Sequence, residues 1–264
     1  MAKNTIAAEP AVLSEKKGNI AWVTMNRGAS LNSLTAELCD ALVAALAECE
    51  RDEDIRAVIL CSAGKAFCAG GDLRTIALLD DVESAKGYVR TAGNVVRAVV
   101  KSRKPYIAMV GGAAAGAGFN LALACDFICA SKRAKFTQAF SSIGLISDCG
   151  GNLLLPRLVG SMTAKKLMML PETITAEEAE RLGIVTITAD ESDLRNVTSA
   201  LAERLAKQPS LAIAEIKRIQ NDASAIEEIL RTEEEIQARL IMSEDCKEGV
   251  RAFFEKRKAD FREK

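Results

Sequence analysis

Short apolar segments alternate with helix-like segments through the first three-quarters of the chain. The expected strands are residues 20–24, 57–61, 106–110, 127–130 and 184–187, which are rich in β-branched residues and bounded by breakers. Between the first two, Leu38, Leu42 and Leu46 recur at helical spacing. Thr175 and Glu178 have the spacing of a capping box at a helix start. This alternation predicts an α/β domain with crossover connections.

The pattern changes after about residue 200, where no further strand is expected. Residues 201–207, 211–221 and 225–242 have helical periodicity, and Ile229, Ile236 and Leu240 form one stripe on the last of them. No internal repeat or low-complexity linker separates the two parts. We therefore expect a core of residues 1–200 with a helical appendage, residues 201–264, whose apolar faces pack on the core or on another subunit.

The charge balance gives no sign of a nucleic-acid partner. The chain of 264 residues has 35 Lys and Arg against 36 Asp and Glu, so no global basic excess attracts a phosphate backbone. No apolar run has the length that spans a bilayer, and the first residues, MAKNTIAAEP, lack the apolar stretch of a secretory signal. We expect a soluble cytoplasmic protein without a membrane partner.

The content of histidine and cysteine restricts the possible chemistry. The chain has no histidine, which excludes a Ser-His-Asp triad, a Cys-His pair and a histidine general base. The eight cysteines show no CxxC pair, so we expect reduced, mostly buried thiols and no metal site. Proton transfer must therefore be carried out by Asp, Glu, Lys, Tyr or Cys.

Two expected strands run into glycine-rich turns, at residues 58–73 and 106–126. The second turn is not a dinucleotide-binding turn, because Leu121 stands where the third glycine of that motif belongs. Small residues at a helix start let a ligand approach unpaired backbone N–H groups, and two such donors would stabilise negative charge on a carbonyl oxygen. Tight packing of a helix on a strand would require the same residues.

The two turns resemble the oxyanion-hole loops of the crotonase (enoyl-CoA hydratase/isomerase) superfamily. The motifs that carry this resemblance are AGKAFCAGGDL (63–73), GGAAAGAGFNLALACDF (111–127), MNRGASLNSL (25–34), FSSIGLISDCGGNLLLPRLVG (140–160) and EGVRAFFEKRKADF (248–261). The resemblance implies a spiral of repeated βαβ turns with a helical C-terminal region that forms trimers, or hexamers as dimers of trimers. It also implies that the backbone N–H groups of Gly71 and Ala117 hold a thioester enolate oxygen.

The acid and base residues of the resemblance favour isomerisation over hydration. Where enoyl-CoA hydratases place two glutamates that hold a water, this chain has Asn120 and Phe140, and neither can move a proton. Asp148 matches the carboxylate of isomerase-type members and is expected to move a proton along the acyl chain. The motifs are most similar to the phenylacetyl-CoA isomerases of aromatic catabolism, although Ser147 and Asn152 depart from that pattern.

Other interpretations stay open at this point. Asp148 could instead be the N-cap of the following helix, or a nucleophile as in aryl-CoA dehalogenases. Asn120 could be only a polar residue of a helical turn, and Phe140 only part of the core. At the level of function, the alternatives are a hydratase, an acyl-CoA hydrolase on the same scaffold, and a CoA-binding or RNA-binding relative without this catalysis.

The resemblance also names candidates for binding the acyl-CoA substrate. Around the first loop these are Lys65, Ala66, Phe67, Ala69 and Arg74, and in the C-terminal segment they are Phe254 and Lys258. The basic side chains are expected to contact the nucleotide end of coenzyme A, those of the C-terminal segment from a neighbouring subunit. Coenzyme A is part of the substrate, so no separate cofactor is expected. Solvated surface charge is the alternative for each basic residue.

Overall fold

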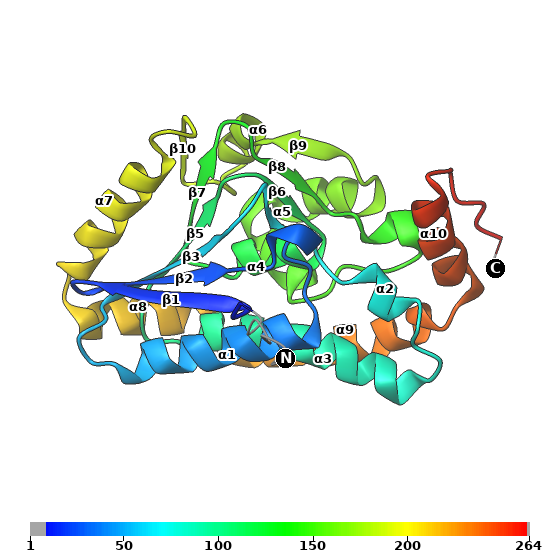
Figure 1. The fold of residues 1–264 in the computed structure, drawn as a ribbon, viewed down its shortest axis with the longest axis horizontal. Helices are drawn as coiled ribbons and strands as arrows, with labels where there is room; N and C mark the ends of the chain where they lie inside the picture. The colour runs from blue at the N-terminus through cyan, green and yellow to red at the C-terminus, as the bar shows by residue number, and fades with distance from the viewer. Residues whose placement is uncertain (1–8, 263–264) are drawn as a thin grey trace, which may run out of the picture.

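The computed structural model describes residues 9–262, which form two β-sheets and the helices around them (Figure 1). Most of the MAKNTIAAEP segment therefore lies outside the described residues. The strands are β1 (Val12–Lys17), β2 (Ile20–Met25), β3 (Ala57–Ser62), β4 (Ala66–Cys68), β5 (Tyr106–Val110), β6 (Ala113–Ala115), β7 (Phe127–Ser131), β8 (Lys135–Thr137), β9 (Thr173–Thr175) and β10 (Ile187–Ala189). The helices are α1 (Ala36–Arg51), α2 (Leu73–Ile76), α3 (Val82–Lys101), α4 (Ala117–Leu123), α5 (Gly151–Met169), α6 (Ala176–Arg181), α7 (Leu194–Ala206), α8 (Ser210–Asn221), α9 (Ala223–Ile241) and α10 (Glu244–Glu255).

The chain winds as a spiral that adds one strand to each sheet per turn. The larger sheet has the order β1-β2-β3-β5-β7-β10 and the smaller one β4-β6-β8-β9. In the turns β3–β4, β5–β6 and β7–β8, the first strand enters the larger sheet and the second enters the smaller one, each in parallel with the matching strand of the neighbouring turn. Strand β9 ends the smaller sheet and runs antiparallel to β8. The expected α/β spiral is confirmed.

Both faces of the larger sheet are covered. Trp22, Ile59 and Ile107 pack with α7 on one face, while α1 and α3 lie side by side across the other face, with α9 next to α3 (Figure 1). Burial on both faces explains why β2, β3, β5 and β7, which run parallel, are apolar at nearly every position. The edge strand β1 runs antiparallel to β2 and is mostly exposed and polar. None of the helices in the described residues is both long and apolar enough to cross a membrane.

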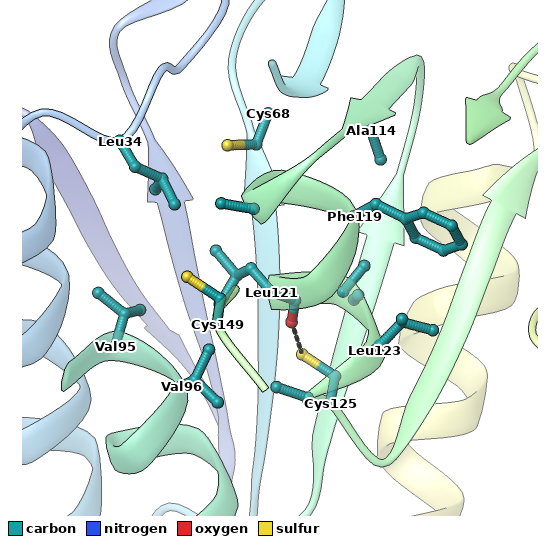
Figure 2. Packing of buried hydrophobic residues seen from close by; sticks show 14 of the residues in the cluster. Leu34, Cys68, Val95, Val96, Ala114, Phe119, Leu121, Leu123, Cys125 and Cys149 are labelled. Carbon is teal, nitrogen blue, oxygen red and sulfur yellow. Dashed lines mark hydrogen bonds between the residues drawn. The ribbon is translucent and has the colours of Figure 1, made fainter. Parts of the chain in front are cut away.

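Helix α4 lies in the middle of the main core (Figure 2) and is apolar nearly all round, with Asn120 as its one polar residue. Phe119, Leu121 and Leu123 are all buried among side chains from the sheets and from α3. The eight cysteines are buried free thiols, as expected, and Cys125 donates to the Leu121 carbonyl oxygen (Figure 2). A helix that is apolar all round is stable only in such surroundings.

Two sequence expectations about element bounds need correction. The strand expected at 184–187 begins only at Ile187, because Gly183 (φ +76°) ends α6 and the Ile184 N–H closes that helix by donating to the Ala179 carbonyl. Helix α7 begins seven residues before the expected position 201. On α9, the expected stripe of Ile229, Ile236 and Leu240 is only half-buried. The capping box of Thr175 and Glu178 is confirmed.

The side of α9 that faces the core carries polar residues as well as apolar ones. The buried positions are Ile226, Leu230, Glu233, Glu234, Gln237, Ala238 and Ile241. Ion pairs hold the helix to α3: Arg97 pairs with Glu227 at 3.0 Å, and Arg90 pairs with Glu234. The C-terminal helices thus pack on the core, and α9 brings buried polar groups toward the loop before α5.

Candidate active site

The two glycine-rich turns line one cavity of about 880 Å³. Helices α2, α3, α9 and α10 and the segments 29–35 and 139–148 provide the rest of the wall. Asp72 and Asp148 are the acidic residues in this lining, which is otherwise mostly apolar or backbone. The volume is within the range of small-molecule sites. The structure therefore brings together the segments that the sequence marked separately.

The two turns touch because glycines stand where a side chain would collide. A Cβ on Gly118 would lie 2.4 Å from the Cys68 carbonyl oxygen, and one on Gly70 would lie 2.7 Å from the Ala115 carbonyl oxygen. Gly70 has φ +94°, which other residues rarely adopt. The close packing of a helix on a strand, one of the two sequence interpretations, is thus present.

The same contact leaves two backbone donors open. A Cβ on Gly70 would lie 3.3 Å from the Ala117 nitrogen. The Ala117 amide therefore lies next to the first glycine-rich turn, one residue before Gly71. Ala117 is the first residue of α4, where N–H groups have no partner within the helix. Within residues 9–262 no acceptor is found for the N–H of Gly71 or Ala117. Both residues line the cavity, so the amides are available to a ligand oxygen.

Asp148 is a buried carboxylate with unused hydrogen-bonding capacity. It is 8% exposed, Oδ2 accepts from Gln237 Nε2 at 3.1 Å, and Oδ1 has no hydrogen-bond partner in the described part of the chain. Burial raises the pKa of Asp148 to about 6, although the neighbouring Cys149 thiol and the hydrogen bond from Gln237 oppose this rise. Such a carboxylate is a stronger base than a solvated aspartate and can take up a proton near neutral pH.

Asp148 does not cap α5, contrary to the alternative interpretation of the sequence. The N-cap residue is Gly150, without a side-chain cap. The amide nitrogens of Gly150 and Asn152 instead donate to the Glu233 carboxylate on α9, at 2.7 and 3.2 Å. Burial raises the pKa of Glu233 to about 7. Because Glu233 satisfies the helix start, the Asp148 carboxylate is free for another role.

Asn120 points away from the cavity into a buried polar cluster. Its Nδ2 donates to Ser147 Oγ at 2.9 Å and to the Asp148 carbonyl at 2.7 Å, and its Oδ1 accepts from Gln138 Nε2 at 2.7 Å. Asn152 Nδ2 donates to the Ser147 carbonyl at 2.6 Å. Asn120, Ser147 and Asn152, the three polar departures from the family pattern, thus hold the backbone of the loop that carries Asp148.

The remaining candidates divide into those at the cavity and those away from it. Ala69, Arg74, Phe140 and Phe254 line it, and Phe140 lies against Gly116, with ring atoms 3.6 Å from the place of a Cβ. Ala66 and Phe67 are buried in β4, whereas Lys65 and Lys258 are exposed; none of these four lines the cavity. Contacts of the basic residues with coenzyme A stay a prediction.

Sequence reasoning missed three residues of the site: Tyr88, Glu233 and Gln237. Gln237 lines the cavity, and its amide is held in one orientation because Oε1 accepts from the Ile146 N–H at 3.1 Å and Nε2 donates to the Ile146 carbonyl at 2.9 Å. Glu233 and Gln237 are polar residues four apart on a stripe that includes Ile226 and Leu230. Two polar residues at buried positions of an otherwise apolar stripe were the sequence signal that could have indicated a role in the site.

We predict that Asp148→Asn stabilises the protein at neutral pH. The folded-state pKa of about 6 lies above the ordinary aspartate value of 3.8, so ionisation of Asp148 lowers the free energy of unfolding as pH rises through this window. Removing the buried charge should raise that free energy by about 1–3 kcal/mol at pH 8, and the gain should disappear near pH 4. Denaturant unfolding at both pH values measures the effect; equal stability of the two proteins at pH 8 would show that the carboxylate is not desolvated.

Comparison with known proteins agrees with this geometry. The profile of the enoyl-CoA hydratase/isomerase family matches residues 15–264. The chain is 38% identical to a 1,2-epoxyphenylacetyl-CoA isomerase of Escherichia coli (strain K12), over 95% of this chain and 97% of the relative. It is 34% identical to a short-chain-enoyl-CoA hydratase of Clostridium acetobutylicum, over 94% and 96%.

A solved structure extends the agreement to the whole fold. The structure of an enoyl-CoA hydratase from Mycobacterium avium subsp. paratuberculosis K-10 superposes with a TM-score of 0.87 at 30% identity, covering 96% of this chain and 99% of that one. Sequence, fold and the two open amides all agree. The chain is an enzyme of the enoyl-CoA hydratase/isomerase family, within the crotonase superfamily.

Proposed function

We propose that this enzyme is an enoyl-CoA isomerase that uses Asp148 as its only acid–base group. The observation that carries the proposal is the state of the two carboxylates in the cavity. The Asp72 carboxylate caps the start of α2, where it accepts from the amide nitrogen and the hydroxyl of Thr75 at 3.3 and 2.6 Å. Asp148 is the one carboxylate in the lining without such a task.

The proposed reaction moves one proton and one double bond. Asp148 removes a proton from the carbon next to the thioester of a 3-enoyl-CoA, and the electron pair spreads over a dienolate. The Gly71 and Ala117 N–H groups hold the dienolate oxygen, where the negative charge develops. Protonated Asp148 then returns the same proton two carbons further along, which leaves a 2-enoyl-CoA and the original carboxylate.

Hydration is the competing activity in this family, and the site lacks support for it. A hydratase must hold and activate a water, but Phe140 offers an apolar ring to the cavity and the Asn120 amide is bound in the cluster behind it. The relatives' names do not decide the question, since one is called an isomerase and another a hydratase. The residues at the cavity favour the isomerase.

The proposal predicts a clear difference between two substrates. With 3-hexenoyl-CoA the enzyme should form 2-hexenoyl-CoA, because one base suffices for this transfer. Crotonyl-CoA should be hydrated at least about a hundredfold more slowly, the usual scale of a missing acid–base group. Product mass and double-bond position, followed for both substrates in one preparation, measure this. Comparable hydration, or release of free CoA from 3-hexenoyl-CoA, would contradict the assignment.

Asp148→Asn should abolish isomerisation and leave binding intact. An amide cannot accept the proton, so we expect kcat to fall by about a hundredfold or more, with the affinity for a saturated acyl-CoA nearly unchanged. The matched control is Asp72→Asn, which changes the other carboxylate of the cavity and keeps the cap of α2, because Asn and Asp cap comparably. A fully active Asp148→Asn enzyme would place the base elsewhere.

We also propose that the protein assembles as a trimer or hexamer. Leu211, Ile216 and Ile219 on α8 are 72, 59 and 65% exposed, and Phe253 on α10 is 60% exposed. Apolar groups of this size are usually covered by a partner. Sedimentation at micromolar concentration should give three or six times the mass of the chain. A stable monomer under those conditions would rule out the assembly.

A further inference from the structure

Tyr88 places a phenol hydroxyl beside the first open amide of the site. The residue lies on α3 and lines the cavity next to the first glycine-rich turn. Its oxygen accepts from the Asp72 N–H at 2.7 Å and lies 2.8 Å from the place of a Cβ on Gly71. Only a glycine at position 71 leaves room for the hydroxyl at this point.

The Tyr88 hydroxyl oxygen already accepts one hydrogen bond, but within the described residues its hydrogen is still free to be donated. A phenol can accept from one group and donate its hydrogen to another. The Asp72 amide fills the first role, and no acceptor for the hydrogen is found among residues 9–262. Burial, and secondarily the charge of Asp148, raises the pKa of Tyr88 well above its ordinary value. The group therefore stays protonated and remains a donor at neutral pH.

Apart from Asp148 Oδ1 and the amides of Gly71 and Ala117, the polar groups deep in the cavity are already engaged. The Gln237 amide is bound to Ile146 and to Asp148, and the Asp72 carboxylate caps α2. The walls around them are apolar, among them Ile76, Leu145 and Ile241. A hydrocarbon chain that fills this space would displace water from the Tyr88 hydroxyl and leave its hydrogen unpaired, which is unfavourable.

We propose that Tyr88 is a specificity-determining residue that donates its hydroxyl hydrogen to an oxygen on the acyl group of the substrate. The enzyme then selects acyl-CoA thioesters with an oxygen function close to the thioester over plain hydrocarbon chains. This inference rests on the proposed placement of the thioester oxygen at Gly71 and Ala117. A site with a buried donor discriminates against ligands that lack the matching acceptor, because the donor is left unpaired.

The test compares two saturated ligands that the isomerase cannot turn over. Dissociation constants of 3-hydroxybutanoyl-CoA and butanoyl-CoA are measured by calorimetry for the wild-type enzyme and for Tyr88→Phe. Wild type should bind the hydroxylated ligand roughly three- to tenfold more tightly, the usual effect of one hydrogen bond. Tyr88→Phe should bring the two constants together by weakening only the hydroxylated ligand. The matched control is Tyr106→Phe, since Tyr106 is buried in β5 away from the cavity, and it should keep the wild-type ratio.

Two results would overturn the inference. Equal binding of both ligands by wild type would mean that no oxygen of the acyl group reaches Tyr88. Equal weakening of both ligands by Tyr88→Phe would mean that the residue acts only by holding the Asp72 amide and the loop. Because the ratio needs no turnover, an intact ratio in an enzyme without isomerase activity would overturn the proposed reaction alone.

Discussion

The close contact between the two glycine-rich turns is the constraint on which the site depends. Gly118 lets the start of α4 lie against the carbonyl of Cys68, and Gly70 lets the first turn pass the carbonyl of Ala115. Side chains at these glycines would collide with backbone, and the contact leaves Gly71 and Ala117 lining the cavity with no acceptor for either N–H found among residues 9–262. The spiral supplies this contact by placing β4 and β6 as neighbours in the smaller sheet.

A second layer of contacts holds Asp148, the proposed base. Asp148 lies on a loop whose backbone is bound by Asn120, Asn152 and Gln237, while Glu233 takes over the start of α5. This arrangement keeps a carboxylate buried with one oxygen unpaired. Such burial is unfavourable for folding, and the same desolvation makes the group basic enough to exchange a proton near neutral pH. Stability and reactivity at this position are therefore opposed.

The residues that depart from the family pattern have identifiable structural roles around Asp148 and the cavity. Asn120, Ser147 and Gln138 bond to one another in a closed buried cluster, so the amide at position 120 supports the loop rather than a water. Phe140 lies against Gly116 and keeps that side of the cavity apolar. Only a few polar groups then face the acyl chain, which is why a single free donor such as the Tyr88 hydroxyl can decide which acyl group fits.

Local sequence determined β2, β3, β5 and β7 of the larger sheet, the missing histidine chemistry and the motifs of the two turns, whereas β1 and the short strands β4, β6, β8 and β9 were not expected from it. Periodicity and capping residues act over a few positions, so four of the five expected strands and the Thr175 cap could be predicted. The relation of Asp148 to Glu233 and Gln237 could not, because about ninety residues of chain separate hydrogen-bond partners that only the packing of α9 brings together. For the same reason the raised pKa of Asp148 and the position of Tyr88 at the cavity are properties of the tertiary structure. Both depend on how distant segments pack around these side chains, which no local pattern specifies.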